Sequence, residues 1–274
     1  MSTLLFQISD LHIREPGRLA YGRLDTAPYL RRAIQTVKTC PQPPSAVVLT
    51  GDLTDFGRPA EYAHLRALLE PLDCPVYLLP GNHDEPAAMR ESFPEHAYLG
   101  NDGHIQYSVP IGDLQLIALD TTVPMQSHGT LCTERLGWLE AELDRVRHRP
   151  VVIAMHHPPF RTLIGHMDRI GLLEGTEGLA RIIEAHRNVE RVICGHLHRS
   201  INVRFAGTIA STSPAPAHQV VLDLQPAAPS NWNLEPGGFC IHAWTPGSGL
   251  VSHVQPVGDF EGPYPFHMDG ALID

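Results

Sequence analysis

Side chains that can bind metal ions follow five short apolar stretches within the first 200 residues. They are Asp10 and His12, Asp52, Asn82 and His83, His156, and His196 and His198. Two-metal hydrolases use carboxylate, amide and imidazole groups to hold a pair of divalent ions about 3.5–4 Å apart. If these side chains converge in space, their chemistry is that of a binuclear metal-dependent hydrolase.

The apolar stretches that precede these residues have the pattern of buried β-strands. They are short, rich in branched residues and followed by turn residues, and they cover residues 4–8, 46–50, 76–79, 151–155 and 189–194. Helical patterns alternate with them at about residues 25–38, 59–70, 86–92, 133–146 and 176–186. In an open α/β sheet, the loops at the carboxyl ends of the strands cluster and bind ligands. The alternation therefore predicts that the polar loops meet at one sheet edge.

The remaining segments are predicted to be mostly β-structure. Hairpin-like strands are expected at residues 104–109 and 114–119, and shorter ones at 203–205, 220–224, 239–244 and 250–254. A flexible, partly apolar loop is expected over residues 160–175. We predict one α/β domain of two packed sheets with helices outside, plus a C-terminal β extension. A separate small domain over residues 207–274 is the alternative, but no clear linker precedes it.

Charge and composition exclude several classes of function. The net charge of −10 argues against a protein that grips a nucleic acid polymer by its phosphates, but not against a small anionic substrate. No stretch reaches the roughly 18–20 apolar residues of a membrane helix, and the start lacks the basic region of a signal peptide. Five scattered cysteines without a C-x-x-C motif indicate reduced thiols and predict a cytoplasmic location.

Five motifs together resemble the calcineurin-like metallophosphoesterases. They are Asp-x-His at residues 10–12, Gly-Asp at 51–52, Gly-Asn-His-Asp at 81–84, His-His at 156–157 and Gly-His-x-His at 195–198. Each is weak alone, but all five occur in order, each behind an apolar strand. The resemblance implies a four-layer αββα sandwich of two mixed sheets flanked by helices. It implies a core over residues 1–206 and an extension over 207–274 that completes the sheet and is a candidate oligomer interface.

The resemblance also implies a set of ligands for two divalent ions. Asp10, His12 and His198 are expected to hold one ion, Asn82, His156 and His196 the other, and Asp52 to bridge them. Ligation by oxygen and imidazole without cysteine leaves Mn, Fe, Zn and Co open. Asp84 is expected to support the ligands, and His157 to point away from the ions.

Within the family, the chain is similar to class III cyclic-nucleotide phosphodiesterases and bacterial glycerophosphodiesterases. The stretches that carry this similarity are residues 19–22, 57–62, 155–159, 217–220 and 259–264. Protein Ser/Thr phosphatases of the superfamily have Arg and Glu where this chain has Phe56 and Asp84, which counts against that activity. The similarity implies substrate contacts from Tyr21 and His218, beside Asn82 and His83.

The predicted reaction is hydrolysis of a small phosphodiester, either glycerophosphodiester-like or a 3′,5′-cyclic nucleotide. Two divalent ions with Asp10 and Asp52 leave a local charge of about +2, which attracts the phosphate. Metal binding lowers the pKa of a bound water toward ~7, and the resulting hydroxide attacks phosphorus in line. Asp52, Asn82 and His83 are the predicted catalytic residues, with His83 stabilising or protonating the leaving alkoxide.

Three other functions compete with this prediction. A phosphomonoesterase would use the same ligands, and a non-catalytic scaffold would keep the fold but lose them. A nuclease is disfavoured because the chain lacks a basic stripe with aromatic residues. We expect a homo-oligomer, a dimer or larger, without a membrane partner. The apolar loop over residues 160–175 and the C-terminal extension are the segments that could close the pocket.

Overall fold

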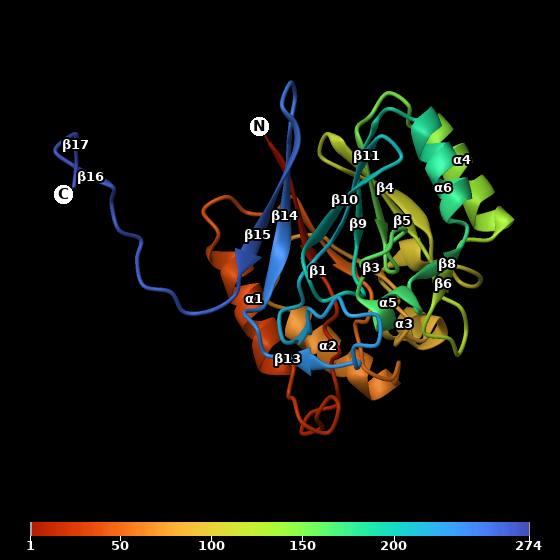
Figure 1. Ribbon diagram of the computed structural model, residues 1–274, viewed down its shortest axis with the longest axis horizontal. Helices are drawn as coiled ribbons and strands as arrows, with labels where there is room; N and C mark the ends of the chain where they lie inside the picture. Colours follow the sequence, from red (N-terminus) through yellow and green to blue (C-terminus); the bar gives the residue numbers. More distant parts are fainter. Residues whose placement is uncertain (1, 274) are drawn as a thin grey trace.

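Two mixed β-sheets pack face to face in the computed structural model, which describes residues 2–273 (Figure 1). The first sheet has the order β15-β14-β1-β2-β3. Its strands are β1 (Thr3–Ile8), β2 (Ala46–Thr50), β3 (Val76–Leu79), β14 (Gly238–Thr245) and β15 (Gly249–Pro256). β1, β2 and β3 run parallel, whereas β14 is antiparallel to β1. The three parallel strands therefore end at one edge.

The second sheet has the order β10-β11-β9-β7-β5-β4. Its strands are β4 (Tyr107–Ile111), β5 (Leu114–Leu119), β7 (Val151–Met155), β9 (Val189–Cys194), β10 (Ile201–Phe205) and β11 (Thr208–Thr212). β5, β7, β9 and β11 are parallel neighbours, while the outer strands β4 and β10 pair antiparallel. Buried parallel strands of this kind explain the nearly continuous apolar runs in the sequence.

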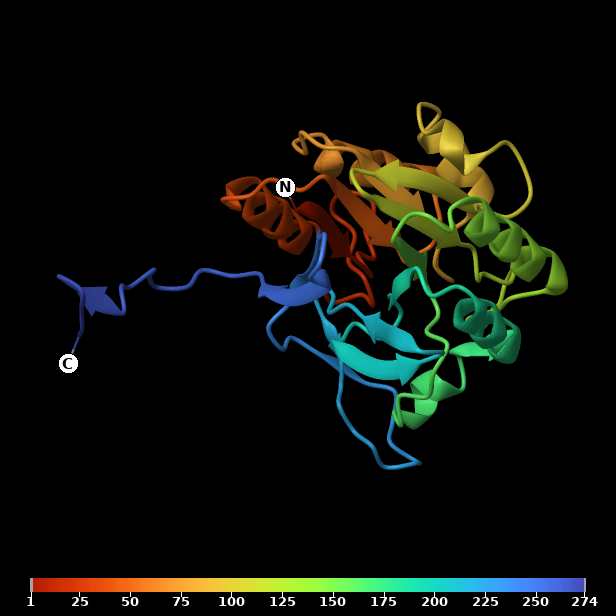
Figure 2. The ribbon, with the colours of Figure 1, turned by 90° about the horizontal axis from the view of Figure 1, so that it is seen from above.

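Helices cover the outer faces of the two sheets (Figure 2). The main ones are α1 (Ala27–Thr39), α2 (Pro59–Leu69), α3 (Pro86–Ser92), α4 (Thr133–Arg145) and α6 (Thr176–Ala185). Alternation along β7 explains the layers: Val152 and Ala154 pack in one core with the first sheet, whereas Ile153 and Met155 pack with α4 and α6. The predicted four-layer αββα architecture is thus confirmed.

A buried hydrogen-bond network joins the two sheets beneath their carboxyl edge. The Gln7 amide on β1 donates to the Thr50 hydroxyl on β2 and to the Cys194 carbonyl on β9, each at 2.9 Å. His242 on β14 reaches the Gln7 side-chain oxygen at 3.0 Å. Because buried polar groups without partners are costly, this network fixes how the sheets face each other.

Some elements differ from the sequence predictions. The expected loop over residues 160–175 contains α5 (Gly165–Asp168) and β8 (Leu172–Glu174), which pairs with β6 (Gly129–Thr130). The strand expected at 220–224 is only β12 (Gln219–Val220), paired with β13 (Trp232–Asn233), and the strand expected at 104–109 begins at residue 107. β11 was not predicted, and it inserts residues 208–212 into the middle of the second sheet. Tertiary pairing decides strands this short, because local pattern is weak over two to five residues.

The C-terminal segment leaves the body after β15. Figures 1 and 2 both show it extending away, ending in the small hairpin of β16 (His267–Met268) and β17 (Ala271–Leu272). The remaining short element is the 3₁₀ turn η1 (Ala97–Leu99). The segment predicted as an extension, residues 207–274, contributes β11 to the second sheet and β14 and β15 to the first. Its last residue, Asp274, lies outside the described residues, as does Met1.

The cysteines and the helices bear on the cellular setting. All five cysteines are free, with Cys194 and Cys240 buried and Cys132 exposed, as expected for reduced thiols. Within residues 2–273, no helix is both long and apolar enough to cross a membrane. The cytoplasmic location stays a prediction, which fractionation of cells that express the chain would check.

Candidate metal centre

The carboxyl ends of the strands from both sheets bring the predicted ligands to one place. Asp10 and His12 follow β1, Asp52 follows β2, Asn82 follows β3, His156 follows β7, and His196 and His198 follow β9. All of them are buried except Asn82, which is half-buried. The first sheet thus contributes both carboxylates and the amide, and the second sheet contributes three of the four imidazoles.

The backbone at five of the candidate ligands is in the left-handed region, which residues other than glycine rarely adopt. Asp10, His12, Asp52, His196 and His198 have φ values of 57°, 45°, 49°, 71° and 50°. Left-handed backbone at residues other than glycine is strained, and it persists where the surroundings impose it, often at functional sites. Here the Asp10 and His12 amides donate to the carbonyls of Gly51 and Asp52. These hydrogen bonds hold the two loops against each other and turn the ligands inward.

Asp52 lies between the imidazoles contributed by the two sheets. Its Oδ2 is 3.4 Å from His156 Nε2 and 3.7 Å from His12 Nε2, while its Oδ1 accepts a 2.9 Å hydrogen bond from the His83 amide. A Cβ at Gly81 would come within 2.3 Å of the Asp52 amide nitrogen, so glycine is needed there. The backbone therefore fixes this carboxylate at the middle of the site.

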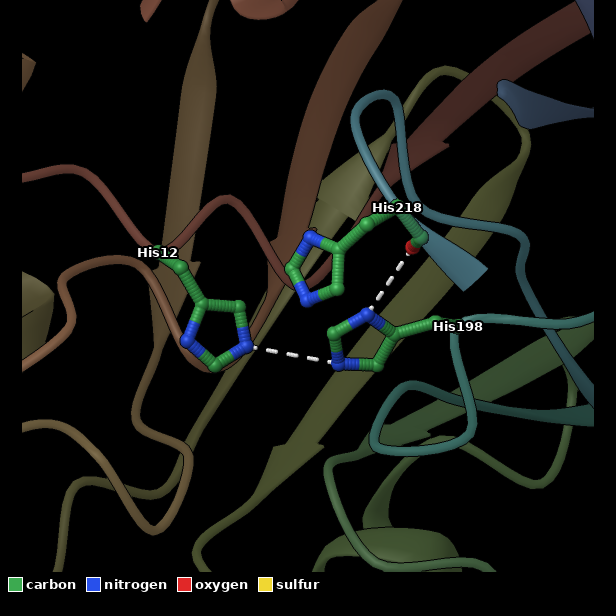
Figure 3. A group of neighbouring side chains, drawn as sticks. All are labelled: His12, His198 and His218. Carbon is green, nitrogen blue, oxygen red and sulfur yellow. Dashed lines mark hydrogen bonds between the residues drawn. The ribbon is translucent and has the colours of Figure 1, made fainter. Parts of the chain in front are cut away.

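His12 and His198 form the first group of ligands with Asp10. Their Nε2 atoms face each other at 3.3 Å (Figure 3). Asp10 Oδ1 is 3.6 Å from His198 Nε2. His198 Nδ1 donates to the carbonyl of His218 at 3.1 Å, and His12 Nδ1 donates to Asp55 Oδ1 at 3.3 Å. Both Nδ1 protons are therefore committed to the protein, which directs the Nε2 lone pairs toward each other.

His156 and His196 form the second group with Asn82. His156 Nδ1 donates to the Thr50 carbonyl at 2.9 Å, which leaves its Nε2 as an acceptor. That Nε2 is 3.2 Å from Asn82 Oδ1 and 3.3 Å from His196 Nδ1. Three candidate ligand atoms thus converge on one point.

Divalent cations fit both groups. Facing lone pairs repel unless a cation or proton lies between them, and buried polar atoms without partners are costly. Asp10 Oδ2 and His196 Nε2 are buried and have no hydrogen-bond partner in the described part of the chain. Carboxylate, amide oxygen and imidazole together suit first-row divalent transition metals. The donor set therefore has the chemistry, and the unmet hydrogen-bonding capacity, of a metal centre.

Burial and mutual charge set the protonation states in this centre. Burial lowers the pKa of His196 well below its ordinary value and that of His198 to about 4. Burial also opposes protonation of His156, but the negative charge of Asp52 outweighs it and raises the pKa of His156 to about 9. Burial likewise works against the charge of Asp52, yet the His156 and His83 charges hold its pKa well below the usual range. Asp52 is therefore ionised, and His196 and His198 are neutral, the form that binds metal, whereas His156 would lose a proton when it binds a cation.

His83 lies beside the first group, on the same loop as Asn82. Its ring packs edge-on against His12 at 4.7 Å between centroids, and its Nδ1 donates to the Asp55 carbonyl at 2.9 Å. Asp55 Oδ2 also accepts a hydrogen bond of 3.2 Å from the Arg14 guanidinium. Asp55 thus orients both His12 and His83, a role that the sequence reasoning did not assign. The spacing Gly-Asp-x-x-Asp at residues 51–55 was the available signal.

His218 and Tyr21 form one wall beside the first group of ligands. The His218 ring lies 4.5 Å from that of His198 between centroids, and its Nε2 is 3.2 Å from the Tyr21 hydroxyl. Trp232 packs on Tyr21 at 5.6 Å and extends this wall. Burial lowers the pKa of His218 strongly, so its ring is neutral. Trp232 was not predicted, because it lies more than 200 residues from Tyr21 in the sequence and nothing in its local sequence links it to the site.

Comparison with known sequences decides the family. The sequence model of the calcineurin-like phosphoesterase family matches residues 4–200, which is most of the chain. The chain belongs to the calcineurin-like phosphoesterase family. It is therefore a phosphoesterase, an enzyme of a family that uses divalent metal ions, and the buried ligand groups fit that use. The scaffold alternative required eroded ligands, whereas all seven are present.

Relatives of the chain extend over its whole length. It is 36% identical over 272 residues to a probable glycerophosphodiester phosphodiesterase GpdQ of Arcobacter nitrofigilis, covering 99% of this chain and 100% of the relative. It is 30% identical over 262 residues to a cAMP/cGMP dual specificity phosphodiesterase of Mycobacterium tuberculosis, covering 94% of this chain and 80% of the relative. A dimetal phosphatase from Danio rerio shares the fold, with a TM-score of 0.62, 16% identity, and 93% and 99% coverage.

Two further residues, Asp84 and His157, adjoin the candidate ligands. The Asp84 carboxylate accepts hydrogen bonds from the amides of Leu53, Thr54 and Gly81 and from the hydroxyls of Thr54 and Tyr62. His157 meets the Thr121 hydroxyl through Nδ1 at 2.8 Å and the Ser127 carbonyl through Nε2 at 3.2 Å. These partners engage both of its nitrogens, although its ring lies 4.7 Å from that of His196 and one of its nitrogens lies within 4.8 Å of nitrogens of His156 and His196. That His157 does not bind an ion stays a prediction.

Replacing Asp55 by asparagine is expected to weaken metal binding at the first group. The amide removes the charge that orients His12 and, through it, the Nε2 lone pair. Replacement of a residue that supports a metal ligand typically lowers metal affinity or activity by about 10- to 100-fold. Titration calorimetry with Mn²⁺ and Zn²⁺ measures the change, with the exposed Asp113→Asn as control. Unchanged affinity in Asp55→Asn would show that His12 does not depend on this contact.

Proposed function

We propose that this phosphoesterase is a binuclear metal-dependent phosphodiesterase acting on small phosphodiesters, of the glycerophosphodiester or 3′,5′-cyclic nucleotide type. The observation that carries the proposal is the position of Asp52, whose Oδ2 lies within 3.7 Å of an imidazole from each ligand group. A carboxylate shared in this way is what a pair of ions needs to stay close. Full-length relatives named as glycerophosphodiester and cyclic-nucleotide phosphodiesterases support the choice of diester.

In this proposal each ion has three ligands of its own and shares Asp52. Asp10, His12 and His198 hold one ion, and Asn82, His156 and His196 hold the other. Bound Mn, Fe, Zn or Co ions would lower the pKa of a coordinated water toward ~7 and withdraw charge from the phosphoryl oxygens. The protein contributes fixed ligand directions, since each ligating imidazole except His196 has its other nitrogen hydrogen-bonded.

His83 is the residue that we assign to protonation of the leaving alkoxide. The Asp55 carbonyl accepts the Nδ1 proton of His83, so only the imidazolium form of the ring also carries a proton on Nε2. In this form His83 would give the Nε2 proton to the departing alkoxide and become a neutral imidazole. The ring lines the same cavity as Asp52 and Asn82, so it can reach a phosphate placed between the ligand groups. Asn82 and His83 would contact the substrate from the loop after β3, and His218 and Tyr21 from the wall beside the first ligand group.

Parallel assays on metal-loaded enzyme test the proposal. Bis(4-nitrophenyl) phosphate and 4-nitrophenyl phosphate report diesterase and monoesterase activity with the same chromophore. A diester preference of about 10-fold or more in kcat/KM is expected, and a strong monoester preference would favour the phosphomonoesterase alternative. A second panel contrasts glycerophosphoethanolamine with 3′,5′-cyclic AMP, and it identifies which diester class is the better substrate.

We also propose that the C-terminal segment binds a second copy of the chain. Phe260, Tyr264, Phe266 and Leu272 are largely exposed on it, Phe266 at 82%. A hairpin of two-residue strands is not stable by itself, and exposed apolar clusters mark contact surfaces. Truncation after Val257 is therefore expected to lower the mass measured by light scattering to that of the monomer. An unchanged oligomer after truncation, or a full-length monomer, would refute this role.

A further inference from the structure

His166 is a buried histidine whose ring has no hydrogen-bond partner. It is only 8% exposed, and within residues 2–273 no hydrogen bond satisfies its fully buried Nδ1. Other buried imidazoles of this chain have protein partners, for example His186 with Ile182 and Asp144, and His242 with Gln7 and Ser252. The enclosed Nδ1 is out of reach of a ligand, whereas Nε2 is not enclosed and makes no hydrogen bond within residues 2–273. Nε2 is therefore the nitrogen of His166 that is open to a ligand.

The surrounding fold holds His166 firmly in place. Its neighbours Ile164 and Met167 pack in a small apolar cluster with Leu197 and Val220, residues next to the ligand loops. The Asp168 carboxylate accepts hydrogen bonds from the Thr162 amide and hydroxyl at 2.6 and 2.8 Å. The missing partner is therefore not the result of a loose loop, because α5 is anchored on both sides of the histidine.

His166 lines the same cavity as the candidate metal centre. This cavity of about 190 Å³ is shared with Asp52, His83 and His218. Its volume lies below the roughly 300–1,000 Å³ usual for drug-sized ligands, so it suits a small substrate. No lysine or arginine lines it, and Asp52 is its only carboxylate. A second charged group on the substrate would consequently find no fixed counter-charge outside the metal centre.

The chemistry of this wall suits a neutral hydroxyl group. Burial, with the nearby Arg169 charge, lowers the pKa of His166, so the ring is neutral. A neutral imidazole offers one donor and one acceptor, and an alcohol hydroxyl offers the same pair in return. Ser127, Ser230 and Asn231 also line the cavity and add uncharged polar groups. The combination matches a polyol better than a plain alkyl group.

We propose that His166 binds a hydroxyl of the alcohol portion of the phosphodiester and so selects glycerol-type esters over unsubstituted alkyl esters. This inference rests on the proposed phosphodiesterase function and deepens it. His166 is then a substrate contact that sets specificity, in the segment that follows the His-His motif at residues 156–157. A cyclic nucleotide is the competing occupant, because its ribose also carries a hydroxyl.

The test compares substrates that differ only in their hydroxyl groups. Glycerophosphoethanolamine and propyl phosphoethanolamine share the phosphate and the amine, but the second lacks both glycerol hydroxyls. For His166→Leu, kcat/KM is expected to fall about 10-fold on the glycerol diester, the loss of one good hydrogen bond, and less than about twofold on the propyl diester. His166→Gln, which keeps a donor and an acceptor, should recover part of the loss. Leu173→Ala, an exposed change in the same segment, is the matched control.

The outcomes separate this inference from the proposed function. An equal loss on both diesters, or no loss on either, would overturn the role of His166. Wild-type enzyme that cleaves bis(4-nitrophenyl) phosphate but does not prefer the glycerol diester to the propyl diester would overturn the polyol assignment and leave the phosphodiesterase proposal standing. Wild-type enzyme inactive on every diester would refute the proposed function. In that case Trp232 fluorescence on binding glycerol 3-phosphate or propyl phosphate still decides: equal affinity for the two overturns the inference.

Discussion

Asp52→Asn is expected to weaken both metal sites together and to lower kcat/KM by about 10³-fold or more, roughly 4 kcal/mol of transition-state stabilisation. Asparagine is nearly isosteric, so the His83 amide keeps an oxygen acceptor. It removes the negative charge that lies within 3.7 Å of both His12 and His156. Two cations brought close together then repel without a shared anion between them.

Metal analysis and titration calorimetry measure this loss directly. After dialysis, the Asp52→Asn protein should retain clearly fewer metal ions per chain than the wild type. Both binding steps in the titration should shift to weaker affinity. Asp10→Asn is the matched control, because the Asp10 carboxylate lies 3.6 Å from His198 and accepts a hydrogen bond from the His196 amide. It should weaken one step more than the other. If one ion stayed bound to Asp52→Asn with unchanged affinity, the carboxylate would not be a bridge.

His83→Ala is expected to keep its metal ions and to lose about 10²–10⁴-fold in kcat, most strongly on diesters with poor leaving groups. The ring is not among the atoms that converge on Asp52, since its Nδ1 is bound to the Asp55 carbonyl. Its removal therefore leaves the ligand set intact. An aryl leaving group departs without protonation, whereas an alkoxide needs a proton, so the size of the loss should depend on the leaving group.

A series of aryl and alkyl diesters graded by leaving-group pKa provides the measurement. The slope of log kcat against that pKa should become steeper in His83→Ala, with metal content unchanged. His148→Ala, a change of an exposed histidine in the turn after α4, is the control and should leave the slope as in the wild type. A parallel loss on every leaving group would remove His83 from the acid role and assign it to substrate binding.

Most of the candidate ligand set could be proposed from the sequence. The strands at residues 46–50, 76–79, 151–155 and 189–194 occur in the structure with those bounds. A buried parallel strand is locally encoded by its apolar run, and the chain must turn where the run ends. Asp52 and Asn82 therefore had to emerge near one edge of the first sheet, and His156 near one edge of the second, once the strands of each sheet were parallel neighbours. The order of the motifs then indicated the family.

Contacts between distant segments were decided only by the tertiary structure. β11, Trp232 and His166 carry no local pattern that ties them to the site, and each is placed by packing against segments far away in the sequence. The orientation of His12 by Asp55 depends on hydrogen bonds between two loops. Local sequence specifies which elements form and where they end. Which side chains then face the shared cavity depends on sheet order and loop packing, because these set distances between residues that the sequence keeps apart.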